Sequence, residues 1–157
     1  MGDRLKGKVA IITGGNSGIG ESTGRLFAEE GARVVLMARR EEQGQTVANS
    51  ICDSGGEAVF VGCDVGDNES VNSAVQKAAD EWGRVDLLFN NAGGGAGSSF
   101  PNESNEEWQR VIHTNLTGTF YMSQAVWPHL IEAGGGAVVN MSSLAAQRGF
   151  SPAIKKE

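Results

Sequence analysis

The stretch TGGNSGIG, from Thr13 to Gly20, follows the apolar run Val9–Thr13 and opens an amphipathic segment. Its Gly14, Gly18 and Gly20 form the spacing GxxxGxG. Glycines so placed permit a tight turn and let backbone N–H groups approach a pyrophosphate, while the following helix directs its partial positive charge at the phosphates. No GK[ST] follows, which excludes a P-loop. A strand-to-helix turn without a ligand can carry the same pattern, so the rest of the chain must decide.

Strand-like and helix-like segments alternate along the chain. The strand-like runs are apolar on both faces, as is typical of parallel strands covered by helices; they are Val9–Thr13, Val34–Ala38, Ala58–Cys63, Val85–Asn90 and Ala137–Ser142. Helical spacing and capping residues predict helices at Gly18–Glu30, Glu41–Ser54, Asn68–Trp82 and Asn105–Ala133, with loops at Gly93–Ser99 and Gly134–Gly136. The fold class is therefore α/β. We expect one Rossmann-like domain over residues 1–157, a doubly wound parallel sheet of order 3-2-1-4-5 with helices on both faces.

Charge and composition argue against several classes of function. The formal net charge is −6, and basic residues occur singly or in short pairs, so we expect no nucleic-acid partner. The longest apolar runs are strand-sized and the start lacks the apolar core of a signal peptide, so we expect no membrane span and no leader. Cys52 and Cys63 have neither metal spacing nor a CxxC pair, and we interpret them as reduced thiols of a cytoplasmic protein without a metal site.

Polar motifs stand where the predicted strands end. GCDV (Gly62–Val65) ends the third strand, NNAG (Asn90–Gly93) ends the fourth, and VVNMSS (Val138–Ser143) ends the fifth. HTNLTGTF (His113–Phe120) lies within the long fourth helix. An open α/β sheet binds its ligand at the carboxyl ends of its strands. We therefore expect a cleft there, opening between the first and fourth strands.

With these motifs in place, the sequence resembles the short-chain dehydrogenase/reductase family from Lys6 to about Gly149. The resemblance implies a dinucleotide cofactor, and it divides the residues that would bind this cofactor into three sets. The pyrophosphate and adenosine ribose would be held by Gly14, Ser17, Gly18, Ile19 and Gly20; the adenine would be flanked by Asp64 and Val65; the floor of the cleft would be lined by Asn91, Ala92 and Gly93. For Asn90 two interpretations stay open, cofactor contact and a clamp between neighbouring strands.

The end of the second predicted strand bears on the choice between NAD and NADP. An acid there would bond the adenosine 2′-hydroxyl and repel a 2′-phosphate. Ala38 stands where NAD-preferring relatives carry that acid, and Arg39 follows. A guanidinium can pair with a 2′-phosphate, with Arg40 as a helper, although both arginines are also compatible with a solvated helix start. We interpret this stretch as favouring NADP over NAD.

The resemblance further implies that Asn115 supports a water in a proton relay and that Ser143 hydrogen-bonds a substrate carbonyl. In the family this serine works with a YxxxK pair, whose tyrosine donates a proton and whose lysine lowers the pKa of that tyrosine. Lys156 stands at the position of the tyrosine, and the only tyrosine, Tyr121, is expected to be a packing residue of the long helix. We interpret Lys155 and Lys156 as a solvated tail.

Three explanations of the missing pair stay open. The favoured one is a C-terminally truncated NAD(P)-dependent oxidoreductase, whose full-length parent acts on a small-molecule carbonyl or alcohol and which is inactive as this chain. The alternatives are a non-catalytic dinucleotide-binding module with a regulatory or scaffolding role, and a site that a second chain completes. Because the fifth strand is expected at a sheet edge, we also expect exposed apolar surface and self-association, with a homo-oligomer forming through the long helix.

Overall fold

The computed structural model describes residues 2–95 and 101–147 of the 157-residue chain. Two predicted features fall outside these ranges, the end of the glycine-rich loop at 96–99 and the pair Lys155 and Lys156.

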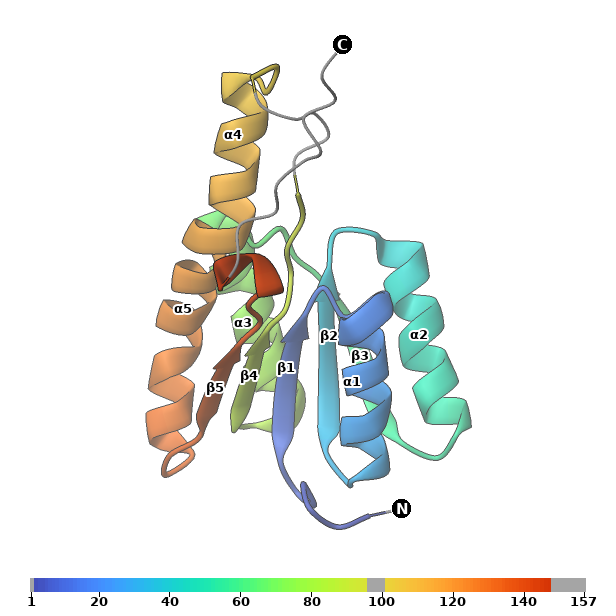
Figure 1. The fold of residues 1–157 in the computed structure, drawn as a ribbon. Coiled ribbons are helices and arrows are strands. Elements are labelled where there is room, and N and C mark those ends of the chain that lie inside the picture. Colours follow the sequence, from blue (N-terminus) through green and yellow to red (C-terminus); the bar gives the residue numbers. More distant parts are fainter. Residues whose placement is uncertain (1, 96–100, 148–157) are drawn as a thin grey trace.

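Five parallel strands form one sheet in the order β3-β2-β1-β4-β5, which confirms the predicted topology (Figure 1). In chain order the strands are β1 Val9–Thr13, β2 Arg33–Ala38, β3 Glu57–Gly62, β4 Leu87–Asn90 and β5 Ala137–Asn140. The predicted bounds agree within two residues. The fifth strand ends before Ser142, because among the described residues the chain makes one further bond to β4, from Met141 N–H to Asn90 O, before the 3₁₀ turn Leu144–Ala146.

Helices cover both faces of the sheet, as predicted. Helices α1 (Gly18–Glu29) and α2 (Glu41–Asp53) lie on one face, and α3 (Asn68–Trp82) and α5 (Gly118–Glu132) lie on the other (Figure 1). Neighbouring residues of β1 show why both faces are apolar: Ile11 packs toward α3 and α5, and Ile12 packs toward α1 and α2. A parallel sheet buried in this way needs a continuous apolar run in its central strands.

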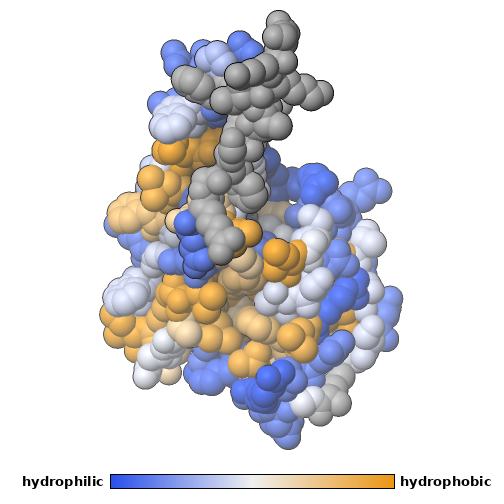
Figure 2. Space-filling model, in the orientation of Figure 1, coloured by the Kyte–Doolittle hydropathy of each residue, from blue (hydrophilic) through white to orange (hydrophobic). Residues whose placement is uncertain are grey.

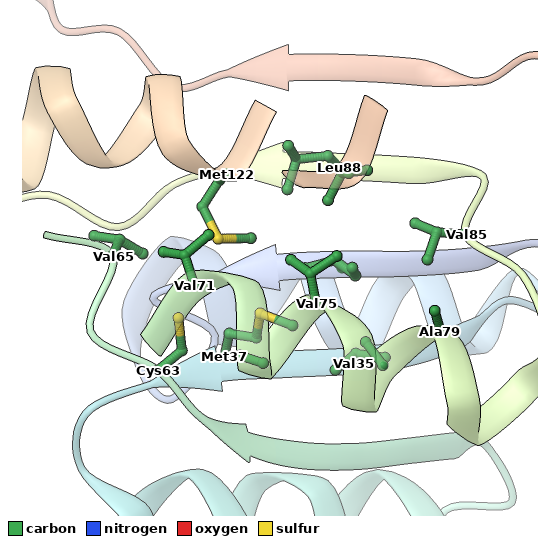
Figure 3. Close-up of a cluster of buried hydrophobic side chains, with 14 of the residues drawn as sticks. Val35, Met37, Cys63, Val65, Val71, Val75, Ala79, Val85, Leu88 and Met122 are labelled. Carbon is green, nitrogen blue, oxygen red and sulfur yellow. The ribbon is translucent and has the colours of Figure 1, made fainter. Parts of the chain in front are cut away.

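The larger core cluster lies between the sheet and α3 and α5. Val71, Val75 and Ala79 recur along α3 at helical spacing and face the sheet, where Met37 and Leu88 meet them (Figure 3). Asp67 caps the start of this helix by accepting a bond from the Glu69 N–H (3.0 Å), and Gly83 ends it with a φ of +70°. The predicted helix Asn68–Trp82 is therefore confirmed at both ends.

The predicted single helix Asn105–Ala133 is wrong in one respect. It consists of α4 (Asn105–Ile112), a π-helical turn (His113–Thr117) and α5. Nδ2 of Asn115 donates a hydrogen bond to the Val111 carbonyl (2.8 Å), and the Thr119 hydroxyl donates one to the Asn115 carbonyl (3.0 Å). Side chains that compete for backbone carbonyls favour a widened turn, and such turns are frequent at functional sites.

Among the described residues no strand pairs with the outer side of β5, as predicted for a strand at the sheet edge. Val139 of β5 is 54% exposed, and apolar surface spreads from this strand onto neighbouring elements (Figure 2). A small apolar hollow of about 160 Å³ lies beside it, between Phe27 of α1 and Phe89 of β4. Over residues 2–95 and 101–147, no helix has the length and apolar character needed to cross a membrane.

Candidate functional site

A cleft of about 590 Å³ lies at the carboxyl ends of the strands. It extends from β1 and β4 across the ends of β2 and β3, so it is wider than the predicted opening between the first and fourth strands. Nine of the residues predicted to bind a cofactor line it: Gly14, Ser17, Ile19, Arg39, Asp64, Val65, Asn91, Ala92 and Gly93. The same cleft is also lined by residues that the sequence did not single out as ligands, including Asn16 and Thr114.

The glycine loop needs its glycines for two different reasons. Gly14 (φ +64°) and Gly18 (φ +55°) adopt a left-handed backbone that other residues rarely take. Gly20 has no room for a side chain, because a Cβ would overlap the Gly14 carbonyl oxygen and lie 2.6 Å from Nδ2 of Asn91. Gly18 and Gly20 do not line the cleft themselves, but they let its wall form.

The start of α1 provides free donors to this wall. Ser17 is the N-cap residue, and its side chain makes no capping bond. The first N–H groups of a helix have no partner within the helix, so those of Gly18, Ile19 and Gly20 are available to an anion. A Cβ placed on Gly18 would meet no described atom within 4 Å, so there is open space beside this residue. Donors, dipole and space together fit a phosphate group.

Thr13 joins the glycine loop to the end of β4. Its buried hydroxyl accepts bonds from the N–H groups of Asn91 and Ala92, both at 2.9 Å. In return, Nδ2 of Asn91 donates to the carbonyls of Thr13 (3.0 Å) and Gly14 (3.4 Å). This role of Thr13 was not predicted from the sequence; its position at the end of a buried strand, opposite the NNAG motif, was the available signal.

The two arginines after β2 differ in their surroundings. Both are exposed and line the cleft. Arg39 has no hydrogen bond or ion pair with any described residue, so its guanidinium is available to a ligand. Arg40 donates from Nη2 to the Ser17 hydroxyl (3.3 Å) and faces the buried Asn16 amide.

The adenine end of the predicted site lies after β3. One oxygen of the exposed Asp64 carboxylate accepts a bond from the Gly66 N–H (3.0 Å), which fixes the direction of the side chain. Val65 is buried and packs against Gly118 of α5, where a Cβ would come within 2.8 Å of it. Burial raises the pKa of the neighbouring Cys63 thiol to about 11, so this wall of the cleft carries a neutral thiol at pH 7.

Asn115 lies at the edge of the site, where its side chain bonds Gly94, the residue after the NNAG motif. Its Nδ2 donates to the Gly94 carbonyl (2.8 Å) as well as to Val111, and its Oδ1 accepts from the Gly94 N–H (3.2 Å). Both amide hydrogens are therefore in use, and one oxygen lone pair remains. Thr114, next to it in the π-helical turn, lines the cleft.

Ser143 is exposed beyond the end of β5 and does not line the cleft. Its Oγ accepts a bond from the Ala145 N–H (3.2 Å) at the start of the 3₁₀ turn. This bond leaves the hydroxyl hydrogen free to be donated elsewhere. The structure therefore places Ser143 at the correct end of the sheet without bringing it into the cleft.

Asn90 lies in the core rather than in the cleft, which favours the clamp of the two open interpretations. It is buried, and its Nδ2 donates to Asn140 of β5 (2.9 Å) and to Ser123 of α5 (3.2 Å). The amide thus ties two strands and a helix together behind the site.

Comparisons with known proteins agree with this architecture. The family model described as "short chain dehydrogenase" matches residues 8–154. The chain is 41% identical over 145 residues to a 3-oxoacyl-[acyl-carrier-protein] reductase of Chlamydia pneumoniae, a match that covers 92% of this chain and 58% of that protein. It is also 41% identical over 144 residues to a 2,5-dichloro-2,5-cyclohexadiene-1,4-diol dehydrogenase of Sphingobium indicum, with the same coverage of 92% and 58%.

A solved structure gives the same result. The crystal structure of a metagenomic short-chain oxidoreductase in complex with NADP superimposes with a TM-score of 0.87 at 35% identity, over 94% of this chain and 67% of that one. The chain thus spans about 58% of the length of the two sequence relatives. By sequence, strand order and fold, this chain belongs to the short-chain dehydrogenase family.

Proposed function

We propose that this chain is the dinucleotide-binding part of an NAD(P)-dependent oxidoreductase. The observation that carries the proposal is the cleft of about 590 Å³, which joins the glycine loop, an unpaired arginine and the Asp64 carboxylate at one edge of the sheet. A dinucleotide offers two negatively charged phosphates and polar riboses to such a wall. The free N–H groups at the start of α1 bind the pyrophosphate, and Asn91, Ala92 and Gly93 form the floor.

NADP is the proposed cofactor, and Arg39 is the residue that selects it. Ala38 at the end of β2 offers no carboxylate to a 2′-hydroxyl, and the Arg39 guanidinium has no competing acid among the described residues. A guanidinium binds a phosphate through charge-assisted, often bidentate bonds. The relative crystallised with NADP supports this choice.

In the whole protein the bound nicotinamide would supply hydride transfer to or from a small-molecule carbonyl or alcohol. Ser143 can donate its free hydroxyl hydrogen to the carbonyl oxygen of a substrate. Asn115 can hold a water with its remaining lone pair, after its other bonds have fixed the loop at Gly94. The substrate itself stays open, because two equally similar relatives are named for a 3-oxoacyl-[acyl-carrier-protein] and for a dichlorinated cyclohexadiene diol.

By themselves, these 157 residues are proposed to bind the nucleotide with little or no turnover. They contain one tyrosine, Tyr121, and residue 125, four positions on, is alanine, so there is no YxxxK pair. Tyr121 is half-buried in α5, and its ring lies 6.0 Å from that of Phe120. A positioned proton donor contributes a factor of about 10² to 10⁴ to the rate.

We also propose that the chain associates with a second copy through α5. Leu116 in the π-helical turn and Phe120, Trp127 and Ile131 in α5 are large and exposed, and their spacing places them along one side of the helix. A stripe of this kind is typical of a surface that another protein covers.

Calorimetric titration of NADP and NAD tests the cofactor proposal. We expect NADP to bind more tightly than NAD, and Arg39→Ala to weaken NADP by about 10- to 100-fold while leaving NAD unchanged, as for one charge-assisted contact. Lys77→Ala, which removes an exposed charge from α3, is the matched control. Equal affinities for NADP and NAD in the unchanged chain would contradict the role of Arg39, and rapid NADPH oxidation with ketones would contradict the proposed lack of turnover.

A further inference from the structure

Arg40 points at the glycine loop rather than into open solvent. Its Nη2 donates to the Ser17 hydroxyl (3.3 Å), at the N-cap of α1. Its Nε and Nη2 also face one end of the Asn16 amide, at 3.1 and 3.2 Å. Because both of those groups are donors, that end of the amide is its oxygen. The guanidinium therefore makes contacts with two consecutive residues of the loop.

Asn16 is suited to transmit this contact. Its side chain lies at the centre of the loop, it is only 5% exposed, and the Gln43 side-chain amide lies 3.1 Å from the same atom. The backbone of Arg40 stands at the start of α2, where its side chain makes no helix cap. The side chain is thus free to link the start of α2 to the start of α1.

A link of this kind would lower the cost of ordering the glycine loop when a ligand binds. Gly14, Gly15 and Gly18 make the chain flexible, and ordering a flexible segment when a ligand binds lowers affinity. A side chain that orders the loop beforehand removes part of that cost. Arg39, which has no partner among the described residues, offers nothing similar.

We infer that Arg40 is a positioning residue that holds the phosphate-binding loop in its binding conformation, while Arg39 alone reads the 2′-phosphate. This inference rests on the proposed dinucleotide function and divides it between two adjacent arginines. Arg40 acts on the part of the ligand that NAD and NADP share. Its loss therefore weakens both nucleotides by the same factor and leaves their ratio unchanged.

Two measurements on the same variants test the inference. In the free chain, hydrogen exchange at the backbone N–H groups of residues 14–18 should accelerate in Arg40→Ala and in Asn16→Ala, and stay unchanged in Arg39→Ala. In calorimetry, Arg40→Ala should weaken NADP and NAD alike, by about tenfold each, as for the loss of one hydrogen bond to a charged group. Arg40→Lys keeps the charge but not the fork of donors, so it should resemble Arg40→Ala.

The outcomes separate this inference from the proposed function. A loss of NADP affinity alone in Arg40→Ala, or full rescue by Arg40→Lys, would show that Arg40 acts as a charge on the 2′-phosphate and would overturn the inference. Unchanged exchange at residues 14–18 would overturn it even if both nucleotides bind. Failure of the unchanged chain to bind either nucleotide would overturn the proposed function, and with it the part of the inference that concerns the ligand. If Arg40→Ala fails to fold, Asn16→Ala gives the same two readouts.

Discussion

At the scale of single residues, Gly20 is where the loop tolerates least change. A Cβ there would overlap the Gly14 carbonyl oxygen, a backbone atom that cannot move without opening the turn. Gly18, by contrast, has room around it and is constrained by its φ of +55°. Two glycines of one motif are thus required for different reasons, one for close packing and one for backbone conformation.

We expect Gly20→Ala to abolish measurable nucleotide binding and to lower the free energy of unfolding by about 1–3 kcal/mol, as for overpacking of a buried site. Urea unfolding followed by circular dichroism and a binding titration are the measurements. Gly62→Ala is the matched control, since a Cβ at that position meets nothing within 4 Å. Wild-type binding in Gly20→Ala would show that the loop is not packed against Asn91 as described.

Some residue roles could be read from the sequence and others could not. The glycines, Arg39, Asp64 and Asn91 follow strand ends, and strand ends converge by topology, so nine predicted binding residues do share one cleft. The bracing contacts of Thr13, Asn16 and Arg40 depend on side-chain directions between segments distant in the chain. No periodicity or local motif encodes those directions.

At the scale of elements, β1 and β4 are joined at their amino-terminal ends by a buried carboxylate. Asp86 is 1% exposed, receives bonds from Arg84 Nη2 (2.6 Å) and Lys8 Nζ (3.1 Å), and accepts from the Val9 N–H (3.0 Å). Burial opposes its ionisation, but the bonds from Arg84, Val9 and Lys8 outweigh burial and hold the pKa of Asp86 below its ordinary value.

We expect Asp86→Asn to cost about 2 kcal/mol of unfolding free energy near neutral pH. Because the folded pKa is depressed, the stabilisation is fully present above the unfolded pKa of about 3.9 and is lost as the pH falls through the folded value. The difference between the unchanged chain and the variant should therefore shrink on acidification. Asp80→Asn, on the exposed side of α3, is the control. A difference that does not depend on pH would contradict the ion-pair account.

The long predicted helix shows where element-level prediction stops. Its helical spacing and the presence of capping residues could be read from the sequence, and at its start Ser104 accepts a bond from the Glu107 N–H (3.1 Å). The π-helical turn could not be predicted in this way, because Asn115 in this turn bonds the Gly94 carbonyl, distant in the chain, as well as the Val111 carbonyl. No local sequence pattern shows such a contact.

At the scale of the whole molecule, the two ends of the sheet differ. The β3 edge lies beside α2 and α3, whereas the β5 edge and α5 expose large apolar side chains (Figures 1 and 2). Trp127 is 58% and Ile131 is 67% exposed, and the outer side of β5, which no described strand covers, lies nearby. Open edges and apolar stripes favour association.

We expect the chain to self-associate in sedimentation equilibrium at micromolar concentration, and the double variant Trp127→Glu with Ile131→Glu to shift it toward the monomer by at least tenfold in dissociation constant, because a buried charge opposes the contact. Leu26→Glu, which adds a charge of the same sign at an exposed leucine of α1, should leave the association unchanged. A strictly monomeric unchanged chain, or equal effects of the two changes, would contradict association through α5.

Mapping of NADP binding by ¹H–¹⁵N NMR tests most directly whether a dinucleotide binds in the cleft at the carboxyl ends of the strands. We expect shifts at residues 14–20, at Arg39, at Asp64 and at 91–93. A second groove of about 590 Å³ beside β3, which Lys77 and Glu81 line, should stay unshifted and serves as an internal control. Shifts confined to that second groove, or no shifts at millimolar NADP, would contradict the account.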